Sequence, residues 1–368
     1  YPKLLFLSAQ NLILHLRIVS HFLPIANGKI ILHFPDIFSI INKNDQNRRR
    51  NISMKIVFLD AKTIGDDIDL SGYEELGEVV KYDFSSSEEV PARVIDADVL
   101  VLNKVQVNEH TIGTARNLKL VCVTATGTNN LDKDYLARRN IAWRNVAGYS
   151  TESVAQHTFA MLFYLLEKLR YYDDYVKEER YVDDTIFTHF AERFCQINGK
   201  TWGIIGLGNI GRRVADIAKA FGANVIYYST SGSNTQDGYT RTDFDTLLAT
   251  SDIISVHAPL TPNTEHLIDA KALSKMKPSA IFLNLGRGPI VVEEDLADAL
   301  ESGQIAAAGL DVLCTEPMCA TNPLLRIKDS KKLLITPHIA WASVEARTSL
   351  MNIILGQIQD WKKETEAM

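Results

Sequence analysis

The chain has 368 residues, of which 46% are hydrophobic, and this is enough material for two sizeable cores. Its formal net charge of -6 argues against a general nucleic-acid binder, because such a protein carries a basic excess. We therefore expect a small-molecule partner, with no nucleic acid and no membrane.

The cysteines narrow the expected compartment. They form no Cys-x-x-Cys pair and have no histidine at ligand spacing: Cys122, Cys195, Cys314 and Cys319. We expect free thiols in a reducing, cytoplasmic compartment and no metal site.

The first 53 residues differ in pattern from the rest. They are rich in Ile, Leu, Asn, His and Phe and lead to the basic run Arg48-Arg49-Arg50. Their charges leave no stretch long enough to span a bilayer and do not fit a signal peptide. Because a typical opening strand starts at Met54, we expect Met54 to be the natural start and residues 1–53 not to be native. The alternative is a membrane-surface or targeting extension.

From Met54 onwards, short apolar runs alternate with helical segments, a pattern typical of parallel α/β units. Helices are predicted over 87–95 and 131–139. Strands are predicted at 55–59, 78–82, 99–102 and 120–124. No glycine-rich dinucleotide turn occurs in this region, so nothing in it marks a cofactor domain.

Residues 151–179 form a long helical pattern that is predicted to bridge two domains, with Thr151 suited to be its N-cap. The next segment, residues 180–198, carries aromatic residues among charges: Tyr181, Phe187, Phe190 and Phe194. It is either an arm or interface loop, or a surface excursion with a local aromatic cluster. The first possibility, together with the long helix, predicts a homodimer.

A second α/β series begins at Thr201. Strands are predicted at 202–205, 225–228, 253–257, 280–283, 306–310 and 333–336. Helices are predicted at 212–221, 244–249, 270–276 and 294–302. Six strands that begin just before a glycine turn match the doubly wound dinucleotide-binding fold.

A last amphipathic helix is predicted over 343–363 and is expected to pack back on the first domain. The fold class is therefore α/β, with two Rossmann-like doubly wound parallel-sheet domains joined by long helices. The substrate (catalytic) domain is predicted to comprise residues 54–150 plus 338–368. The dinucleotide-binding domain with its linking helix comprises residues 151–337.

The glycine turn reads Gly206-Leu207-Gly208-Asn209-Ile210-Gly211, between an apolar run and a helical segment. The first glycine permits the turn, and the second lets backbone N–H groups approach a pyrophosphate. The third brings the helix close to the strand. An ordinary tight turn is the alternative, but the strand before it and the helix after it favour a dinucleotide site.

The acid that usually selects the cofactor is missing. In this fold an Asp or Glu roughly 20 residues beyond the glycines binds the adenosine ribose and selects NAD over NADP. The expected position is Ser229, and a hydroxyl neither repels nor neutralises a 2′-phosphate. Arg241 is too far along the sequence to place. The predicted cofactor is NAD, with NADP also possible.

Three polar residues follow strands of the second series: Arg287, Glu316 and His338. Ligands of open α/β sheets bind at the carboxyl ends of strands, so these side chains are expected at the same edge as the glycine turn. Histidine suits proton transfer near neutral pH, and a neighbouring carboxylate favours the imidazolium. A guanidinium can hold a carboxylate while it polarises the adjacent carbonyl. The set therefore predicts reduction of a 2-oxo acid, although each residue alone could be structural.

From Met54 to its end, the chain resembles the D-isomer-specific 2-hydroxyacid dehydrogenases. The resemblance rests on the glycine turn, His257-Ala258-Pro259-Leu260-Thr261, Asn284 to Gly288, Gly309 to Val312 with Glu316-Pro317, and Pro337-His338. It implies that Arg287 binds and polarises the substrate, that Glu316 partners the histidine, and that His338 is the acid/base.

The resemblance also implies the binding residues. Cofactor contacts are expected at Gly206, Gly208, Asn209, Ile210, Gly211, Ser229, His257, Ala258, Pro259, Thr264, Leu285, Gly286, Arg287, Asp311, His338 and Ala340. The substrate carboxylate is expected on backbone amides at Lys104-Val105 and Thr126-Gly127. Arg287 and Trp341 complete the substrate-binding residues.

The segments 338–343 and 124–130 look most like the glycerate dehydrogenase (hydroxypyruvate reductase) branch. The expected reaction is reversible NAD(P)H-dependent reduction of hydroxypyruvate or glyoxylate to the D-2-hydroxy acid. D-lactate, D-hydroxyisocaproate or 3-phosphoglycerate are alternative substrates. An NAD(H)-sensing, corepressor-like binding protein is the alternative outside enzymes.

Overall fold

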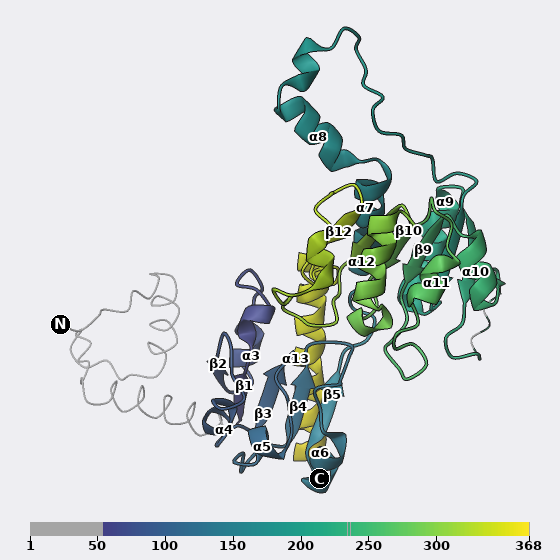
Figure 1. Ribbon diagram of the computed structural model, residues 1–368. Coiled ribbons are helices and arrows are strands. Elements are labelled where there is room, and N and C mark those ends of the chain that lie inside the picture. Colours follow the sequence, from purple (N-terminus) through teal and green to yellow (C-terminus); the bar gives the residue numbers. More distant parts are fainter. Residues whose placement is uncertain (1–53, 234, 236, 368) are drawn as a thin grey trace, which may run out of the picture. The chain divides into compact units, whose positions relative to one another are not determined.

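The computed structural model describes residues 54–233, 235 and 237–367 (Figure 1). The expectation about residues 1–53 lies outside the described residues. Within the described part, the chain forms a five-stranded and a seven-stranded sheet with only parallel neighbours, and helices cover them. The predicted α/β class with two parallel sheets is confirmed.

The first sheet has the order β2-β1-β3-β4-β5. Its strands are β1 (Lys55–Phe58), β2 (Glu78–Lys81), β3 (Val99–Leu102), β4 (Leu120–Val123) and β5 (Ala142–Asn145). Every residue of β3 and β4 is buried, as expected for central strands covered on both faces. Sequence reasoning missed β5, a short edge strand whose Arg and Asn interrupt the apolar pattern.

Short helices connect these strands: η1 (Ala61–Thr63), α3 (Ser71–Glu74), α4 (Val90–Arg93), α5 (Glu109–Ile112) and α6 (Lys133–Arg138). The predicted helices over 87–95 and 131–139 are therefore shorter than expected. Pro91 lies in the first turn of α4, where its missing N–H costs nothing.

The second sheet has the order β12-β11-β10-β9-β6-β7-β8. Its strands are β6 (Thr201–Ile205), β7 (Asn224–Tyr228), β8 (Thr240–Arg241), β9 (Ile253–Val256), β10 (Ile281–Asn284), β11 (Ala307–Leu310) and β12 (Leu333–Ile335). The six predicted strands are present. The two-residue edge strand β8 is additional, and it pairs Arg241 with Tyr227 of β7.

Helices cover both faces of the second sheet: α9 (Asn209–Ala220), α10 (Phe244–Thr250), α11 (Ala270–Ser274) and α12 (Glu293–Ser302), with η3 (Gly288–Ile290) and η4 (Pro323–Arg326). One core cluster packs residues of α10, α11 and α12 on the sheet, and another packs residues of α9 and of the long helix before β6. This is the doubly wound arrangement.

The single helix predicted over 151–179 is wrong. The chain forms α7 (Thr151–Leu166) and α8 (Leu169–Lys177), separated where Lys168 adopts a left-handed backbone with φ of 56°. A lysine in that conformation cannot continue a right-handed helix. The N-cap of α7 is Ser150, one residue before the predicted Thr151.

After α8 comes an arm that consists of η2 (Arg180–Asp183) and residues 184–198. Tyrosines of α8 hold its histidine, since the rings of Tyr175 and His189 stack 3.8 Å apart. The phenylalanines remain exposed, and Phe187 is 89% exposed. The stacked rings are therefore those of His189 and tyrosines of α8, and the cluster of the arm's own aromatic residues that was predicted as one alternative is not the one that forms.

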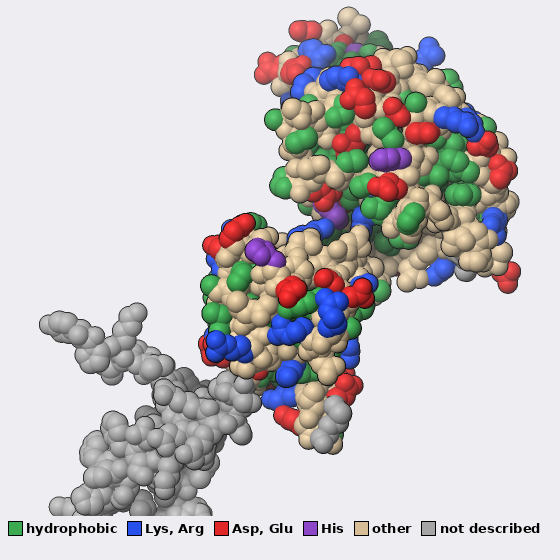
Figure 2. Space-filling view, turned by 60° about the horizontal axis from the view of Figure 1, so that its bottom comes forward, with side chains coloured by type: hydrophobic (Ala, Val, Ile, Leu, Met, Phe, Trp, Pro, Cys, Tyr) green, Lys and Arg blue, Asp and Glu red, His purple; other side chains and the backbone are tan. Residues whose placement is uncertain are grey.

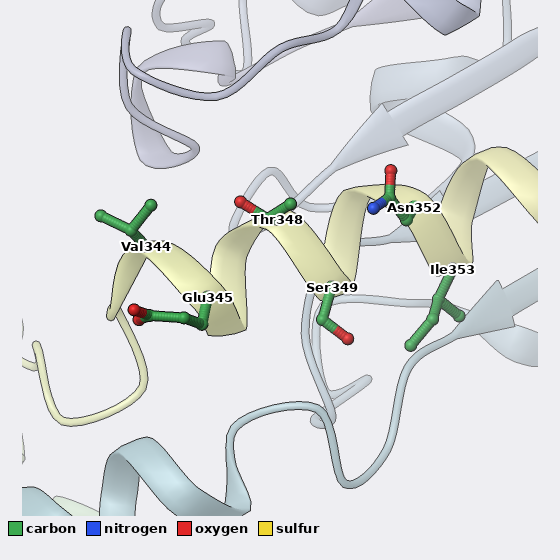
Figure 3. A pocket seen from close by; sticks show the side chains of 6 residues that line it. All are labelled: Val344, Glu345, Thr348, Ser349, Asn352 and Ile353. Carbon is green, nitrogen blue, oxygen red and sulfur yellow. The ribbon is translucent and has the colours of Figure 1, made fainter.

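The last helix, α13 (Val344–Glu366), packs on the first sheet as predicted. Its apolar side chains join the core cluster of Ile56 and Phe58 in β1: Leu350, Met351, Ile354 and Ile358. The opposite side of α13 lines an open hollow of about 620 Å³ (Figure 3). No helix among the described residues is long and apolar enough to cross a membrane.

Candidate active site

The glycine turn has the geometry that its three glycines predict. Gly206 has a φ of 92°, and a side chain there would meet Ala258, which follows β9, at 2.8 Å. Gly211 abuts the Gly206 carbonyl, which leaves no room for a Cβ. A Cβ on Gly208 would meet nothing within 4 Å. The turn is therefore tight on two sides and open at its middle glycine.

That opening lies at the start of α9. Gly208 is the N-cap and provides no side-chain acceptor for the first helical N–H groups of Asn209 and Ile210. Such an end attracts an anion through its N–H groups and the helix dipole. The residues therefore fit the pyrophosphate of a dinucleotide, which would bind on this cradle.

His257 directly follows β9, the strand next to this turn. The imidazole Nε2 lies 3.1 Å from the Ser255 hydroxyl, and Nδ1 has no hydrogen-bond partner among the described residues. Burial lowers the pKa of His257 to about 3, so the ring is neutral. A neutral histidine here is suited to hydrogen bonding and not to charge pairing.

The structure places Arg241, which the sequence could not. The strand β8 lies beside β7, and the Arg241 guanidinium donates to the Gly232 carbonyl at 2.8 Å. Ser229 follows β7 directly and is 3% exposed, and its hydroxyl lies 3.4 Å from that of Ser231. The cofactor-selecting position thus combines hydroxyl groups with a neighbouring cation.

Glu316 and His338 form the predicted pair, with the carboxylate Oε2 2.7 Å from the imidazole Nδ1. The other oxygen, Oε1, accepts the N–H of Leu313 at 3.0 Å. Burial alone raises the pKa of Glu316, but these hydrogen bonds and the Lys104 charge lower it below its usual value. An ionised Glu316 fixes a proton on Nδ1 and leaves Nε2 to exchange protons with a substrate.

Asp311 holds the loop that carries the histidine. It is 2% exposed, and its carboxylate accepts the N–H groups of Ile339 at 2.8 Å and Ala340 at 3.0 Å. Its carbonyl accepts the His338 N–H at 2.8 Å. His338 has a φ of 56°, an unfavourable conformation that these contacts maintain. The carboxylate predicted to touch the cofactor is therefore already bonded to the catalytic loop.

Arg287 lies between the two sheets' loops. Asn284 positions its turn, because the carboxamide donates to the Arg287 carbonyl at 3.0 Å and accepts the Gly286 N–H at 3.1 Å. The guanidinium lies beside Gly127, where a Cβ would be 2.9 Å from Nη2. Gly127 thus lets the cation reach the first-sheet loop that was predicted to bind the substrate.

In the other loop predicted to bind the substrate, at Lys104-Val105, backbone N–H groups already donate to a side chain of the protein. The buried carboxylate of Asp60 accepts the N–H groups of Asn103 at 2.9 Å and Lys104 at 2.7 Å. The Val105 N–H is 3.4 Å from the same carboxylate. Only the second of the two predicted amides, Lys104 and Val105, is therefore weakly held.

Several predicted residues have structural contacts. The Thr126 hydroxyl donates to the Val146 carbonyl at 3.0 Å, and the Thr264 hydroxyl donates to the Pro259 carbonyl at 2.8 Å. Trp341 packs edge-on against Tyr149 with ring centroids 6.3 Å apart, and it contacts cores of both sheets. Leu285 and Ala258 are buried in two core clusters of the second sheet.

Sequence reasoning missed Asp60 and Asn130, which hold the loop after β3. The carboxamide of Asn130 donates to the carbonyls of Asn103 at 3.2 Å and Val105 at 2.9 Å. The available signal was position, since Asp60 comes at the end of the opening apolar strand, where ligands of open sheets bind.

Other surfaces do not compete with this site. The hollow on α13 is lined by none of Arg287, Glu316 and His338. Acidic and basic side chains are interspersed on the face shown in Figure 2. No group of three or more metal-ligating side chains occurs among the described residues.

The doubly wound sheet with its glycine cradle, and a histidine–carboxylate pair beside an arginine, define a dinucleotide-dependent oxidoreductase. The family described as D-isomer specific 2-hydroxyacid dehydrogenase, NAD binding domain, matches residues 159–340.

Full-length relatives extend this match. A hydroxypyruvate reductase of Blautia hydrogenotrophica is 37% identical over 316 residues, which cover 84% of this chain and 97% of the relative. A glycerate dehydrogenase of Methylorubrum extorquens is 35% identical over 310 residues, which cover 84% and 95%.

A solved structure agrees with these relatives. It is an NADPH-dependent glyoxylate/hydroxypyruvate reductase of Sinorhizobium meliloti in complex with NADP and malonate, with 25% identity, a TM-score of 0.70 and coverage of 84% of this chain and 93% of that chain. The chain belongs to the D-isomer-specific 2-hydroxyacid dehydrogenases. It is an NAD(P)-dependent oxidoreductase that acts on the CH–OH group of 2-hydroxy acids.

Proposed function

We propose that this enzyme reduces hydroxypyruvate or glyoxylate to the D-2-hydroxy acid. The main supporting observation is the Glu316–His338 pair, 2.7 Å apart, with an arginine on the neighbouring loop. The names of the relatives, hydroxypyruvate reductase and glycerate dehydrogenase, support this substrate class.

In the proposed reaction, a bound reduced nicotinamide supplies the hydride. His338 gives the proton from Nε2 to the carbonyl oxygen while Glu316 stabilises the imidazolium through Nδ1. Arg287 binds the carboxylate and stabilises the negative charge that grows on the carbonyl oxygen. In the reverse direction, His338 takes the proton from the hydroxyl group.

The proposed binding residues are those predicted from the sequence, without the Lys104 N–H, which Asp60 accepts at 2.7 Å. Trp341, beside Tyr149, limits the substrate pocket to small 2-oxo acids. The amides of the loops at Val105 and at Thr126-Gly127 hold the substrate carboxylate. Residues 54–150 with 338–368 form the substrate domain in this proposal, and residues 151–337 form the dinucleotide domain.

The test is NAD(P)H oxidation by purified protein with hydroxypyruvate, glyoxylate, pyruvate, a branched 2-oxo acid and 3-phosphohydroxypyruvate. Selective turnover of hydroxypyruvate or glyoxylate supports the proposal. A preference for pyruvate or the branched acid indicates a D-lactate or D-hydroxyisocaproate dehydrogenase, and the phosphorylated substrate indicates a phosphoglycerate dehydrogenase. Tight NADH binding without turnover of any of them indicates an NAD(H) sensor.

For the cofactor, we propose that both NADH and NADPH are accepted. Ser229 places no negative charge beside the 2′ position, and Arg241 on β8 supplies a cation to the same loop. Ser229→Asp is then expected to lower kcat/KM for NADPH by about 10- to 100-fold, because a carboxylate repels the 2′-phosphate. Unchanged use of NADPH by this variant would contradict the assignment.

We also propose a homodimer, since the arm exposes Phe187, Phe190 and Phe194. An exposed apolar surface of this kind marks an interaction site, and a second copy of the chain is the expected partner. Light scattering of the protein should give twice the monomer mass, and Phe187→Ser with Phe190→Ser should reduce it to the monomer.

The cytoplasmic location stays a prediction that rests on the four free cysteines.

A further inference from the structure

The loop Asn103–Val105 follows β3, and the loop with Asp60 follows β1. In the strand order β2-β1-β3, successive strands are added on one side of β1 and then on the other, so the strand order reverses between β1 and β3. Open α/β sheets bind their ligands at this place, at the carboxyl ends of the strands. Asp60 is 6% exposed there, and nothing in the proposed reaction uses it.

Successive backbone N–H groups that point to one side form a concave nest for an anion. In the loop Asn103–Val105, the occupant is the Asp60 carboxylate. It accepts the Asn103 N–H with both oxygens, at 2.9 Å and 3.0 Å, and the Lys104 N–H at 2.7 Å. Those two amides are therefore not available to a substrate.

The opposite side of the same loop is held as well. Asn130 donates one carboxamide nitrogen to the carbonyls of Asn103 at 3.2 Å and Val105 at 2.9 Å. The main-chain carbonyl of Asn130 accepts the Val107 N–H at 2.8 Å. The loop is thus fixed through its N–H groups by Asp60 and through its carbonyl groups by Asn130.

One backbone donor on this loop is less engaged than the others. The Val105 N–H is 3.4 Å from Asp60, which is the long limit of a hydrogen bond. The Lys104 N–H is 2.7 Å from the same carboxylate. The Val105 N–H is therefore the amide of this loop that is least committed to Asp60.

We propose that Asp60 and Asn130 are positioning residues that hold the loop Asn103–Val105 so that the Val105 N–H, and not the Lys104 N–H, receives the substrate carboxylate. This inference rests on the proposed function, because it assigns the carboxylate subsite of that reaction. It predicts that loss of either positioning residue weakens recognition of the carboxylate without affecting the cofactor.

The test compares hydroxypyruvate with its uncharged methyl ester. Asp60→Asn removes the anion from the nest and turns an amide toward backbone donors. We expect KM for hydroxypyruvate to rise about 10- to 100-fold, because charged hydrogen bonds are lost. We expect kcat/KM for the ester to change less than about 3-fold and the Kd of NADH to stay within about 2-fold, since neither uses the loop. The preference for the acid over the ester therefore falls.

Asp98→Asn is the matched control. Asp98 also accepts a backbone N–H, that of Lys55 at 2.7 Å, but it precedes β3 at the opposite edge of the same sheet. This variant is expected to lose some thermal stability and to keep the acid-to-ester preference. If Asp60→Asn lowers acid and ester turnover equally, or changes neither, the positioning role is wrong.

Asn130→Ala keeps the inference open to test if Asp60→Asn does not fold or does not bind NADH. It is expected to reduce the acid-to-ester preference in the same direction, and an unchanged preference would overturn the proposal. Failure of the proposed function is seen separately, because the unmodified enzyme would then reduce none of the 2-oxo acids. In that case the subsite assignment fails with it.

Discussion

In each sheet the strand order reverses at one place, between β1 and β3 in the first sheet and between β6 and β9 in the second. Both places present backbone N–H groups at the carboxyl ends of strands. In the second sheet, Gly208 leaves the cradle open, because a Cβ on this residue would meet nothing within 4 Å. In the first sheet, the Asp60 carboxylate fills the equivalent nest.

The difference shows that one backbone device serves two purposes. An open cradle at a helix start can accept a mobile anion such as a pyrophosphate. A filled nest instead fixes its loop, at the cost of burying a carboxylate. Burial raises the pKa of Asp60, although the amides of Lys104, Asn103 and Val105 oppose this effect. The first sheet is thereby suited to present a rigid loop, and the second to bind a cofactor.

The largest effect is expected from a variant that removes proton transfer and leaves the backbone N–H groups of both sheets unchanged. His338→Ala removes the proton donor but touches neither nest, so kcat is expected to fall about 1,000-fold. NADH binding, measured by fluorescence titration, is expected to remain. A near-normal kcat at neutral pH would show that another group transfers the proton.

Glu316→Gln tests the partner of that histidine. The pKa of Glu316 is lowered from 4.5, so the carboxylate is ionised at neutral pH and stabilises the imidazolium. We expect kcat/KM for reduction to fall about 10- to 100-fold, because a charge-assisted hydrogen bond is lost. A kcat/KM within about 2-fold of that of the unmodified enzyme would remove Glu316 from this role.

The same shift predicts a pH effect on stability. A carboxylate whose pKa is lowered on folding adds stability above its unfolded value of 4.5, and the contribution is lost as the pH falls through the lower folded value. The Glu316→Gln protein should lack this contribution. Thermal denaturation of both proteins across the acidic range measures it, and parallel curves would contradict the expectation.

Gly127→Ala tests the place where Arg287, which follows a strand of the second sheet, meets a loop of the first sheet. A Cβ there would lie 2.9 Å from Nη2 of Arg287, so the guanidinium has to move while the fold stays intact. A misplaced polarising group is expected to lower kcat/KM roughly 10- to 30-fold. Gly356→Ala is the control, because a Cβ at that position of α13 meets nothing within 4 Å. Equal activity of both variants would mean that Arg287 does not need this space.

Gly208→Ala is expected to have the smallest effect. The added methyl group has room in the protein but occupies the approach of the pyrophosphate, so KM for NADH should rise about 10-fold. KM for the 2-oxo acid should not change, in contrast to Asp60→Asn. If Gly208→Ala instead raises the KM of the acid, the two edges do not divide substrate and cofactor as described.

Much of this protein could be predicted from its sequence, because local patterns carry the information. Hydrophobic periodicity located the strands of both sheets except the short edge strands β5 and β8. Edge strands are exposed and short, so their residues need not be apolar. The break at Lys168 was also invisible, since lysine is ordinarily a good helix former.

The residue types likewise determined the chemistry. A glycine turn after a strand, and Arg287, Glu316 and His338 after later strands, sufficed to predict hydride transfer to a 2-oxo acid. In the structure the side chains of Glu316 and His338 lie 2.7 Å apart. Parallel strands make this possible, because their carboxyl ends share one edge whatever the sequence separation.

Only the tertiary structure decided which groups are already occupied. Asp60 and Lys104 are 44 positions apart, and no local pattern relates them, yet their hydrogen bond takes an amide that the sequence assigned to the substrate. The contacts of two further residues also depend on the tertiary structure. Asp311 accepts the Ile339 N–H, and Arg241 lies beside β7. A hydrogen bond depends on the distance between two atoms in space, and for residues far apart in the chain only the packing of the sheets sets that distance.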